Sequence, residues 1–153
     1  MRGVVGNHHA QTLLERAVLT DTVSHAYLLT GPEAIGKTTL ALAFATLLLC
    51  QNRAPGSVEA CGECVACRKI AHGVHPDVEI VKPAKDKRTI AVEIIREATR
   101  MANLAPSEGR WRIFIIPDVD SLMPLNHAEA SNALLKTLEE PPEGVVIILT
   151  AVE

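Results

Sequence analysis

The sequence has no hydrophobic run long enough to cross a membrane and no excess of basic residues. Its longest apolar run, Leu40–Cys50, has 11 residues including Thr46, whereas a membrane-spanning helix needs roughly 20. The N-terminal residues MRGVVGNHH have no apolar stretch after the positive charge, so a secretory signal peptide is not expected. The net charge of −3 gives no sign of direct nucleic-acid binding. We therefore expect a cytoplasmic protein with no membrane partner.

The length of 153 residues, with 48% hydrophobic and 22% charged side chains, is typical of one soluble domain that can bury a sizeable core. The sequence has no internal repeat and no low-complexity segment. Short apolar runs that suit strands alternate with segments of helical periodicity. This alternation predicts an α/β fold with a mostly parallel sheet.

The pattern predicts four strands and four helices. The helix at 90–104 has Thr89 as its predicted N-cap, and Pro141-Pro142 ends the helix at 126–140. Among the strands, 25–30 suits a buried strand and 111–116 a central strand covered on both faces. The predicted strands are 25–30, 78–81, 111–116 and 145–150, and the predicted helices are 8–19, 37–50, 90–104 and 126–140.

A glycine-rich stretch, Gly31-Pro-Glu-Ala-Ile-Gly-Lys-Thr38, lies between the first strand and the second helix. It matches the phosphate-binding loop pattern in full. Such a loop turns its backbone N–H groups toward phosphate oxygens, while Lys37 can reach the β- and γ-phosphates and Thr38 can ligate Mg²⁺. The alternative is a chance match in a strand-turn-helix. The predicted nucleotide-binding residues are Gly31, Pro32, Glu33, Ala34, Ile35, Gly36, Lys37, Thr38 and Thr39.

The acidic residues that hydrolysis would need are sparse. Hydrolysis requires a carboxylate at the end of a neighbouring strand to hold Mg²⁺ and usually a second residue to orient water. After the strand at 111–116 the chain has Pro117, Asp118 and, two residues later, Asp120. Asp118 is the candidate catalytic carboxylate, and it can hardly fill both roles. The alternative is that Asp118 and Asp120 only cap a turn.

All four cysteines, Cys50, Cys61, Cys64 and Cys67, fall within 18 residues. Four thiolates suffice for a closed tetrahedral Zn²⁺ site with no open position, which favours a structural over a catalytic metal. Zinc would tie down the polar loop at 51–60. A redox CxxC and an iron–sulfur cluster are the alternatives. His72 and His75 lie nearby and are expected to form hydrogen bonds rather than to ligate the metal.

The motifs together resemble bacterial clamp-loader subunits of DNA polymerase III. SHAYLLTGPEAIGKTTLA, the four cysteines, HGVHPDVEIV, EGRWRIFIIPDVDSL and ASNALLKTLEEPPEG occur in the order found in that family. NALLKTLEEPP is the most specific of them, and the resemblance covers nearly the whole chain. It implies a P-loop NTPase domain of the AAA+, RecA-like class, with a parallel sheet flanked by helices and a zinc module at 50–67 inserted after the P-loop helix.

Two departures favour the δ′-type subunit over the γ/τ-type motor subunit. Pro117 occupies the position of the γ/τ acidic motif's Asp, and Asp118 that of its Glu. The polar sensor residue of the last strand falls at Ala151, while Thr150 comes one residue early. The resemblance thus implies an ATP- and Mg²⁺-binding subunit with little or no hydrolysis of its own. The alternative is a γ/τ-like motor that uses Asp118.

The resemblance also implies partners that this sequence does not identify directly. The full-length protein would join other clamp-loader subunits in a hetero-pentamer and act on the sliding clamp and primer-template DNA indirectly. The chain ends before the family's Ser-Arg-Cys motif, so we expect residues 1–153 to be a C-terminally truncated, near-inactive AAA+ fragment. Lys136 is either a DNA-coupling residue or part of a solvated face. A small-molecule kinase with a zinc lid is the remaining alternative, but it leaves NALLKTLEEPP unexplained.

Overall fold

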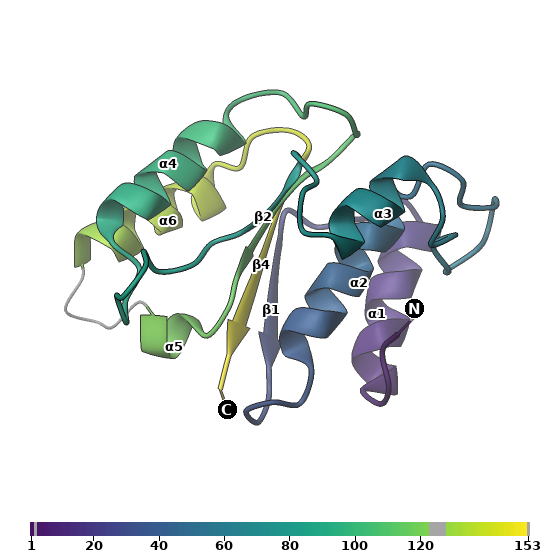
Figure 1. The fold of residues 1–153 in the computed structure, drawn as a ribbon, viewed down its shortest axis with the longest axis horizontal. Helices are drawn as coiled ribbons and strands as arrows, with labels where there is room; N and C mark the ends of the chain where they lie inside the picture. Colours follow the sequence, from purple (N-terminus) through teal and green to yellow (C-terminus); the bar gives the residue numbers. More distant parts are fainter. Residues whose placement is uncertain (2, 123–127, 153) are drawn as a thin grey trace.

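The protein is an α/β domain in which a sheet lies between two layers of helices (Figure 1). The structure is a computed structural model, and it describes residues 1, 3–122 and 128–152. The strands are β1 (Ala26–Thr30), β2 (Val78–Ile80), β3 (Arg112–Ile116) and β4 (Val145–Ala151). The helices are α1 (His8–Leu19), α2 (Lys37–Leu49), α3 (Val65–Ala71), α4 (Val92–Ala102), α5 (Val119–Leu122) and α6 (Ala128–Glu139).

The strands pair in parallel throughout the described part of the chain, in the order β1-β4-β3-β2. The predicted α/β fold with a parallel sheet is therefore confirmed. Because the strands run the same way, their carboxyl ends meet at one edge of the sheet, where ligands bind in folds of this kind. The phosphate loop after β1 and the acidic turn after β3 both lie at this edge.

Alternate residues of the two central strands face two separate hydrophobic cores. All five residues of β3 are buried, which confirms the prediction of a central strand. Helices α1, α2 and α3 cover one face of the sheet, and α4 and α6 cover the other. The strand residues of the first core are Ile113, Ile115, Val146 and Ile148, and those of the second are Phe114, Ile116, Val145 and Ile147.

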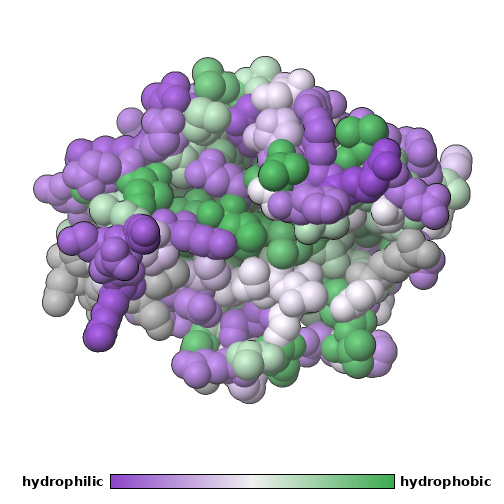
Figure 2. All heavy atoms as spheres, in the orientation of Figure 1, coloured by the Kyte–Doolittle hydropathy of each residue, from purple (hydrophilic) through white to green (hydrophobic). Residues whose placement is uncertain are grey.

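Helix α2 is apolar on nearly every side because it packs between the sheet, α1 and α3. This accounts for the longest hydrophobic run of the sequence. Phe44 of this helix meets Tyr27 of β1 edge to face, with ring centroids 5.1 Å apart. Figure 2 shows hydrophobic atoms gathered in the middle of the molecule, between the helical layers, with hydrophilic atoms over much of the helices. No helix of the described residues is both long and apolar enough to span a bilayer.

The structure corrects two predictions about strand and helix starts. Strand β1 is not a buried strand, because in the described sheet it pairs only with β4, and Leu28 is 58% exposed. Thr89 is not an N-cap, since α4 begins at Val92 with Ala91 before it in an extended conformation. Ile90 is fully buried in the core beside Val81, and this burial holds the chain extended up to Ala91.

The remaining differences concern helices. Helix α3, which carries Cys67, and the short α5 are not predicted from the sequence. In α6, Leu134 and Leu138 pack on the core as expected, whereas Leu135 is 51% exposed and does not belong to it. The predicted start of this helix, at residues 126 and 127, lies outside the described residues. The helix ends at Glu139, ahead of Pro141-Pro142 as predicted.

Candidate nucleotide and metal sites

The phosphate loop occupies the turn from β1 into α2, at the carboxyl edge of the sheet. Gly36 is the N-cap of α2, with φ 94° and ψ 21°, a left-handed conformation that glycine adopts without steric cost. Ala34 is also left-handed, at φ 57°, where a Cβ costs about 1–2 kcal/mol. The chain therefore bends twice within three residues before it enters α2, which exposes backbone N–H groups at the helix start.

The side chain of Lys37 folds back onto the loop that precedes it. The residue is 92% buried, and its Nζ donates hydrogen bonds to the carbonyl oxygens of Gly31, at 2.7 Å, and Pro32, at 2.8 Å. Two carbonyl acceptors compensate the ammonium group for its loss of water. An anion that entered the loop would offer this ammonium charged acceptors, which form stronger hydrogen bonds than neutral carbonyls.

A cavity of about 340 Å³ adjoins the loop. It is lined by residues of α1, β1, the loop and the start of α2. Most of these residues are apolar, and a few are polar. Asn7 lies on its wall and donates from Nδ2 to the carbonyl oxygen of Ile35 at 3.4 Å, which joins the segment before α1 to the loop. The lining includes Asn7, Leu13, Tyr27, Ile35, Lys37 and Leu40.

Asp118 follows β3, which lies two strands from β1 in the sheet. Since neighbouring strands are about 4.8 Å apart, the strand ends that carry the loop and Asp118 are separated by about 10 Å. The Asp118 side chain is exposed, and its backbone is left-handed at φ 47°. Its N–H donates to Oγ1 of Thr150 at 2.9 Å. The structure thus places an exposed carboxylate at the same edge of the sheet as the loop, on a constrained backbone.

The second acid of this turn has a different environment. Asp120 lies in α5, and its Oδ2 accepts a hydrogen bond from the N–H of Val152 at 2.6 Å. At the end of β4, Thr150 is fully buried and Ala151 continues the strand. Ala151, where the resemblance implies a polar sensor residue, has only a methyl group as its side chain.

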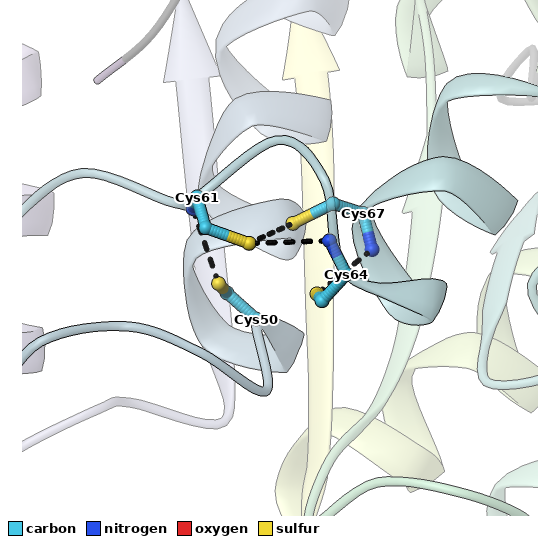
Figure 3. A group of neighbouring side chains, drawn as sticks. All are labelled: Cys50, Cys61, Cys64 and Cys67. Atoms are coloured by element: carbon cyan, nitrogen blue, oxygen red, sulfur yellow. Dashed lines mark hydrogen bonds between the residues drawn. The ribbon is translucent and has the colours of Figure 1, made fainter.

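The four cysteines converge on one small space (Figure 3). Their sulfur atoms all lie within 4.8 Å of one another, and those of Cys61 and Cys67 are 4.0 Å apart. Zn–S bonds of about 2.3 Å in a tetrahedron place sulfurs about 3.8 Å apart. Cys50 follows α2 directly, Cys64 is the N-cap of α3, and Cys67 lies in its first turn. The donor set and spacing fit a single tetrahedral zinc ion.

The thiols of this cluster differ in their readiness to ionise. Burial opposes the ionisation of Cys64, but hydrogen bonds from the N–H groups of Cys67 and Gln51 outweigh it and lower its pKa to about 6. Hydrogen bonds from the N–H groups of Glu63 and Cys64 lower the pKa of Cys61. Burial raises the pKa of Cys67 above the ordinary range of a thiol. Zinc takes thiolates as ligands, so a bound cation would stabilise the charge that burial disfavours here.

A buried polar network opposite the ligand edge is not predicted from the sequence. Asp77 is 99% buried and accepts hydrogen bonds from the N–H groups of Ser107, Glu108 and Gly109, at 2.5–2.9 Å. His75 accepts from the Asp77 N–H at 3.0 Å, as expected for a hydrogen-bonding histidine in a turn. The partners of Asp77 lie 30 to 32 residues away, so the only local signal is the His75-Pro76-Asp77 turn.

Comparison with known proteins identifies the family. The chain matches the family described as "DNA polymerase III, delta subunit" over residues 6–153. It belongs to this family of DNA polymerase III clamp-loader subunits. The resemblance inferred from the motifs is thereby confirmed, together with the AAA+ class and the role of the family in DNA replication.

Curated relatives include both τ and δ′ subunits. The chain is 40% identical over 150 residues to the DNA polymerase III subunit tau of Bacillus subtilis, covering 98% of this chain and 25% of that protein. It is 37% identical over 126 residues to the subunit delta′ of Pseudomonas aeruginosa, covering 82% of this chain and 37% of that protein. The chain thus spans about a quarter to two fifths of the length of these relatives.

A solved structure shares the fold. The DNA polymerase III gamma subunit-related protein of Thermotoga maritima superimposes with a TM-score of 0.58 at 20% identity. The match covers 93% of this chain and 39% of that one. At this identity the likeness supports the α/β fold alone.

Proposed function

We propose that the chain is the nucleotide-binding AAA+ domain of a δ′-like clamp-loader subunit, which binds ATP with Mg²⁺ and hydrolyses it little or not at all. The observation that carries this proposal is the contrast at the ligand edge. The phosphate loop matches its motif in full and holds the ammonium of Lys37 between the carbonyls of Gly31 and Pro32. In the acidic turn, by contrast, Pro117 precedes Asp118, and the carboxylate of Asp120 accepts a hydrogen bond from Val152.

Nucleotide binding would use the loop Gly31–Thr39 and the adjoining cavity. Backbone N–H groups at the start of α2 and the ammonium of Lys37 would hold the phosphates. The Thr38 hydroxyl and Asp118 are the groups that would hold Mg²⁺. The apolar cavity beside Asn7 suits a base, since it opens directly beside the loop.

Weak hydrolysis follows from the groups around Asp118. A hydrolytic site needs one carboxylate on the metal and another residue that orients the attacking water. The next acid along the chain, Asp120, accepts a hydrogen bond from the N–H of Val152, and Ala151 has no polar side chain. Asp118 can therefore hold a metal but lacks a partner for water activation in the described part of the site.

We further propose a structural zinc ion in the insertion at 50–67, within a single domain of residues 1–153. Cys50, Cys61, Cys64 and Cys67 would fill all four zinc positions, which leaves none open for catalysis. In this proposal the domain assembles with other clamp-loader subunits in the cytoplasm, without a membrane partner. It contacts the sliding clamp and primer-template DNA indirectly, through that assembly.

Isothermal titration calorimetry with ATP and Mg²⁺ tests the proposal. We expect one site per chain, and an affinity at least about 100-fold weaker in Lys37→Ala, because the variant loses a buried charged donor. Lys136→Ala removes an exposed lysine on α6 and is the matched control, with unchanged affinity. Steady-state hydrolysis by the assembled complex separates scaffold from motor. A complex ATPase rate that falls in Lys37→Ala would favour the γ/τ-like alternative.

A further inference from the structure

Two hydrogen bonds join the turn after β3 to the end of β4. The N–H of Asp118 donates to Oγ1 of Thr150 at 2.9 Å, and the N–H of Val152 donates to Oδ2 of Asp120 at 2.6 Å. In the first bond the segment after β3 supplies the donor, and in the second it supplies the acceptor. Together they tie Asp118 in the turn and Asp120 in α5 to the end of β4.

Thr150 lies between the phosphate loop and Asp118. It is paired in register with Leu29 of β1, two residues before Gly31. By the alternation of side chains along β4 it shares the face of Val146 and Ile148, which α2 covers. The side chain is fully buried, so its hydroxyl is engaged inside the protein and is not presented to the solvent where a nucleotide would bind.

The backbone of Asp118 requires support. Its φ of 47° is left-handed, a region that aspartate tolerates better than most residues but at a cost. Such outliers persist where the surrounding structure holds them. The hydrogen bond to Thr150 restrains the N–H of this residue, and the bond from Val152 restrains Asp120 two residues later.

We propose that Thr150 is a positioning residue that holds Asp118 in the conformation that ligates the metal of a bound Mg²⁺–nucleotide. This inference rests on the proposed nucleotide-binding function. It assigns Thr150 a role that acts through Asp118, whose backbone N–H its hydroxyl accepts. Asp120 supports the same turn through Val152. Loss of the Thr150 hydroxyl would let the turn relax and move the carboxylate.

The first experiment measures how much Mg²⁺ strengthens binding of the non-hydrolysable analogue AMP-PNP, as the ratio of the dissociation constants in EDTA and in Mg²⁺. We expect Asp118→Asn and Thr150→Val each to reduce this ratio by about tenfold. Thr150→Ser keeps the acceptor and should restore it. The Kd in EDTA should be the same for Thr150→Val and the wild-type protein.

A double-variant cycle separates positioning from direct contact. If Thr150 acts through Asp118, Thr150→Val causes no further loss in the Asp118→Asn background. An equal further loss would show an independent contact and overturn the inference. Thr137→Val is the matched control, because Thr137 is also a buried threonine whose hydroxyl bonds within the fold, to Thr99 and Ala133. It should leave the Mg²⁺ ratio unchanged.

Hydrogen exchange of the Asp118 amide, followed by NMR without nucleotide, tests the structural step separately. Exchange should be at least about tenfold faster in Thr150→Val than in the wild-type protein or Thr150→Ser. Unchanged exchange overturns the inference. If Asp118→Asn lowers the Mg²⁺ ratio and Thr150→Val does not, positioning fails while the proposed function stands. If the wild-type protein does not bind AMP-PNP, the proposed function itself fails.

Discussion

The carboxylate of Asp77 and the guanidinium of Arg112 form a buried ion pair, with Oδ1 and Nη2 3.6 Å apart. Asp77 precedes β2 and Arg112 begins β3, so the pair joins the amino ends of two neighbouring strands. Arg112 also donates to the carbonyl oxygen of Ala105 at 2.9 Å. Both members of the pair therefore hold the segment 105–109. Asp77 accepts hydrogen bonds from its N–H groups, and Arg112 donates to its carbonyl at Ala105.

Replacing Asp77 by Asn should destabilise the protein by about 3–5 kcal/mol, because it leaves the buried Arg112 charge without its partner. Chemical denaturation at neutral pH would measure this loss. Asp21→Asn is the matched control, since Asp21 pairs with Arg110 at the exposed surface, where such pairs contribute at most about 1 kcal/mol. Equal losses in the two variants would contradict a structural role for the buried pair.

The same carboxylate should make stability fall in acid. Burial alone would raise the pKa of Asp77, but the N–H groups of Ser107, Glu108 and Gly109, together with Arg112, lower it below its usual value. A lowered pKa contributes stability above the unfolded value of about 3.9, and this contribution is lost as the pH falls through the folded value. The free energy of unfolding of Asp77→Asn should therefore decrease less below pH 4 than that of the wild-type protein.

Gly109→Ala should destabilise the protein by about 1–3 kcal/mol, the usual cost of overpacking. A Cβ at this position would lie 2.5 Å from Cδ2 of Leu49 and 3.8 Å from Oδ2 of Asp77. Because the nearest atom is the end of a side chain, Leu49→Val should relieve part of the clash. The double variant, measured by thermal unfolding, should then lose less stability than the sum of the single variants. Full additivity would contradict the contact.

The sequence predicted the parts of the fold and sites that depend on local spacing. The phosphate loop is a continuous motif, and the cysteines are close in the chain, so both could be placed before the structure was known. The bonds from Ser107, Glu108 and Gly109 to Asp77 and the bond between Asp118 and Thr150 could not, because each joins residues at least 30 positions apart. Leu28 shows the same limit. The apolar run that contains it resembles a buried strand, but its exposure follows from the place of β1 in the strand order of the sheet.

Ala34 provides a test of strain in the phosphate loop. Its left-handed φ of 57° is hardest for β-branched residues, so Ala34→Val should weaken ATP binding by about tenfold or more, which corresponds to about 1.4 kcal/mol of added strain. Ala34→Gly removes the Cβ penalty and should retain binding. Calorimetry on both variants gives the comparison. Equal affinities for the two would show that this conformation is not needed for phosphate binding.

Elemental analysis should find one zinc ion per chain. Cys64→Ser should lose it and increase proteolysis within residues 51–70, because a structural metal contributes binding energy to folding. Glu63→Gln is the matched control: Glu63 is an exposed neighbour of Cys64 and does not belong to the converging set, so zinc should remain. A metal-free protein that resists proteolysis in this segment would instead show that the packing of the four thiols alone orders the insertion.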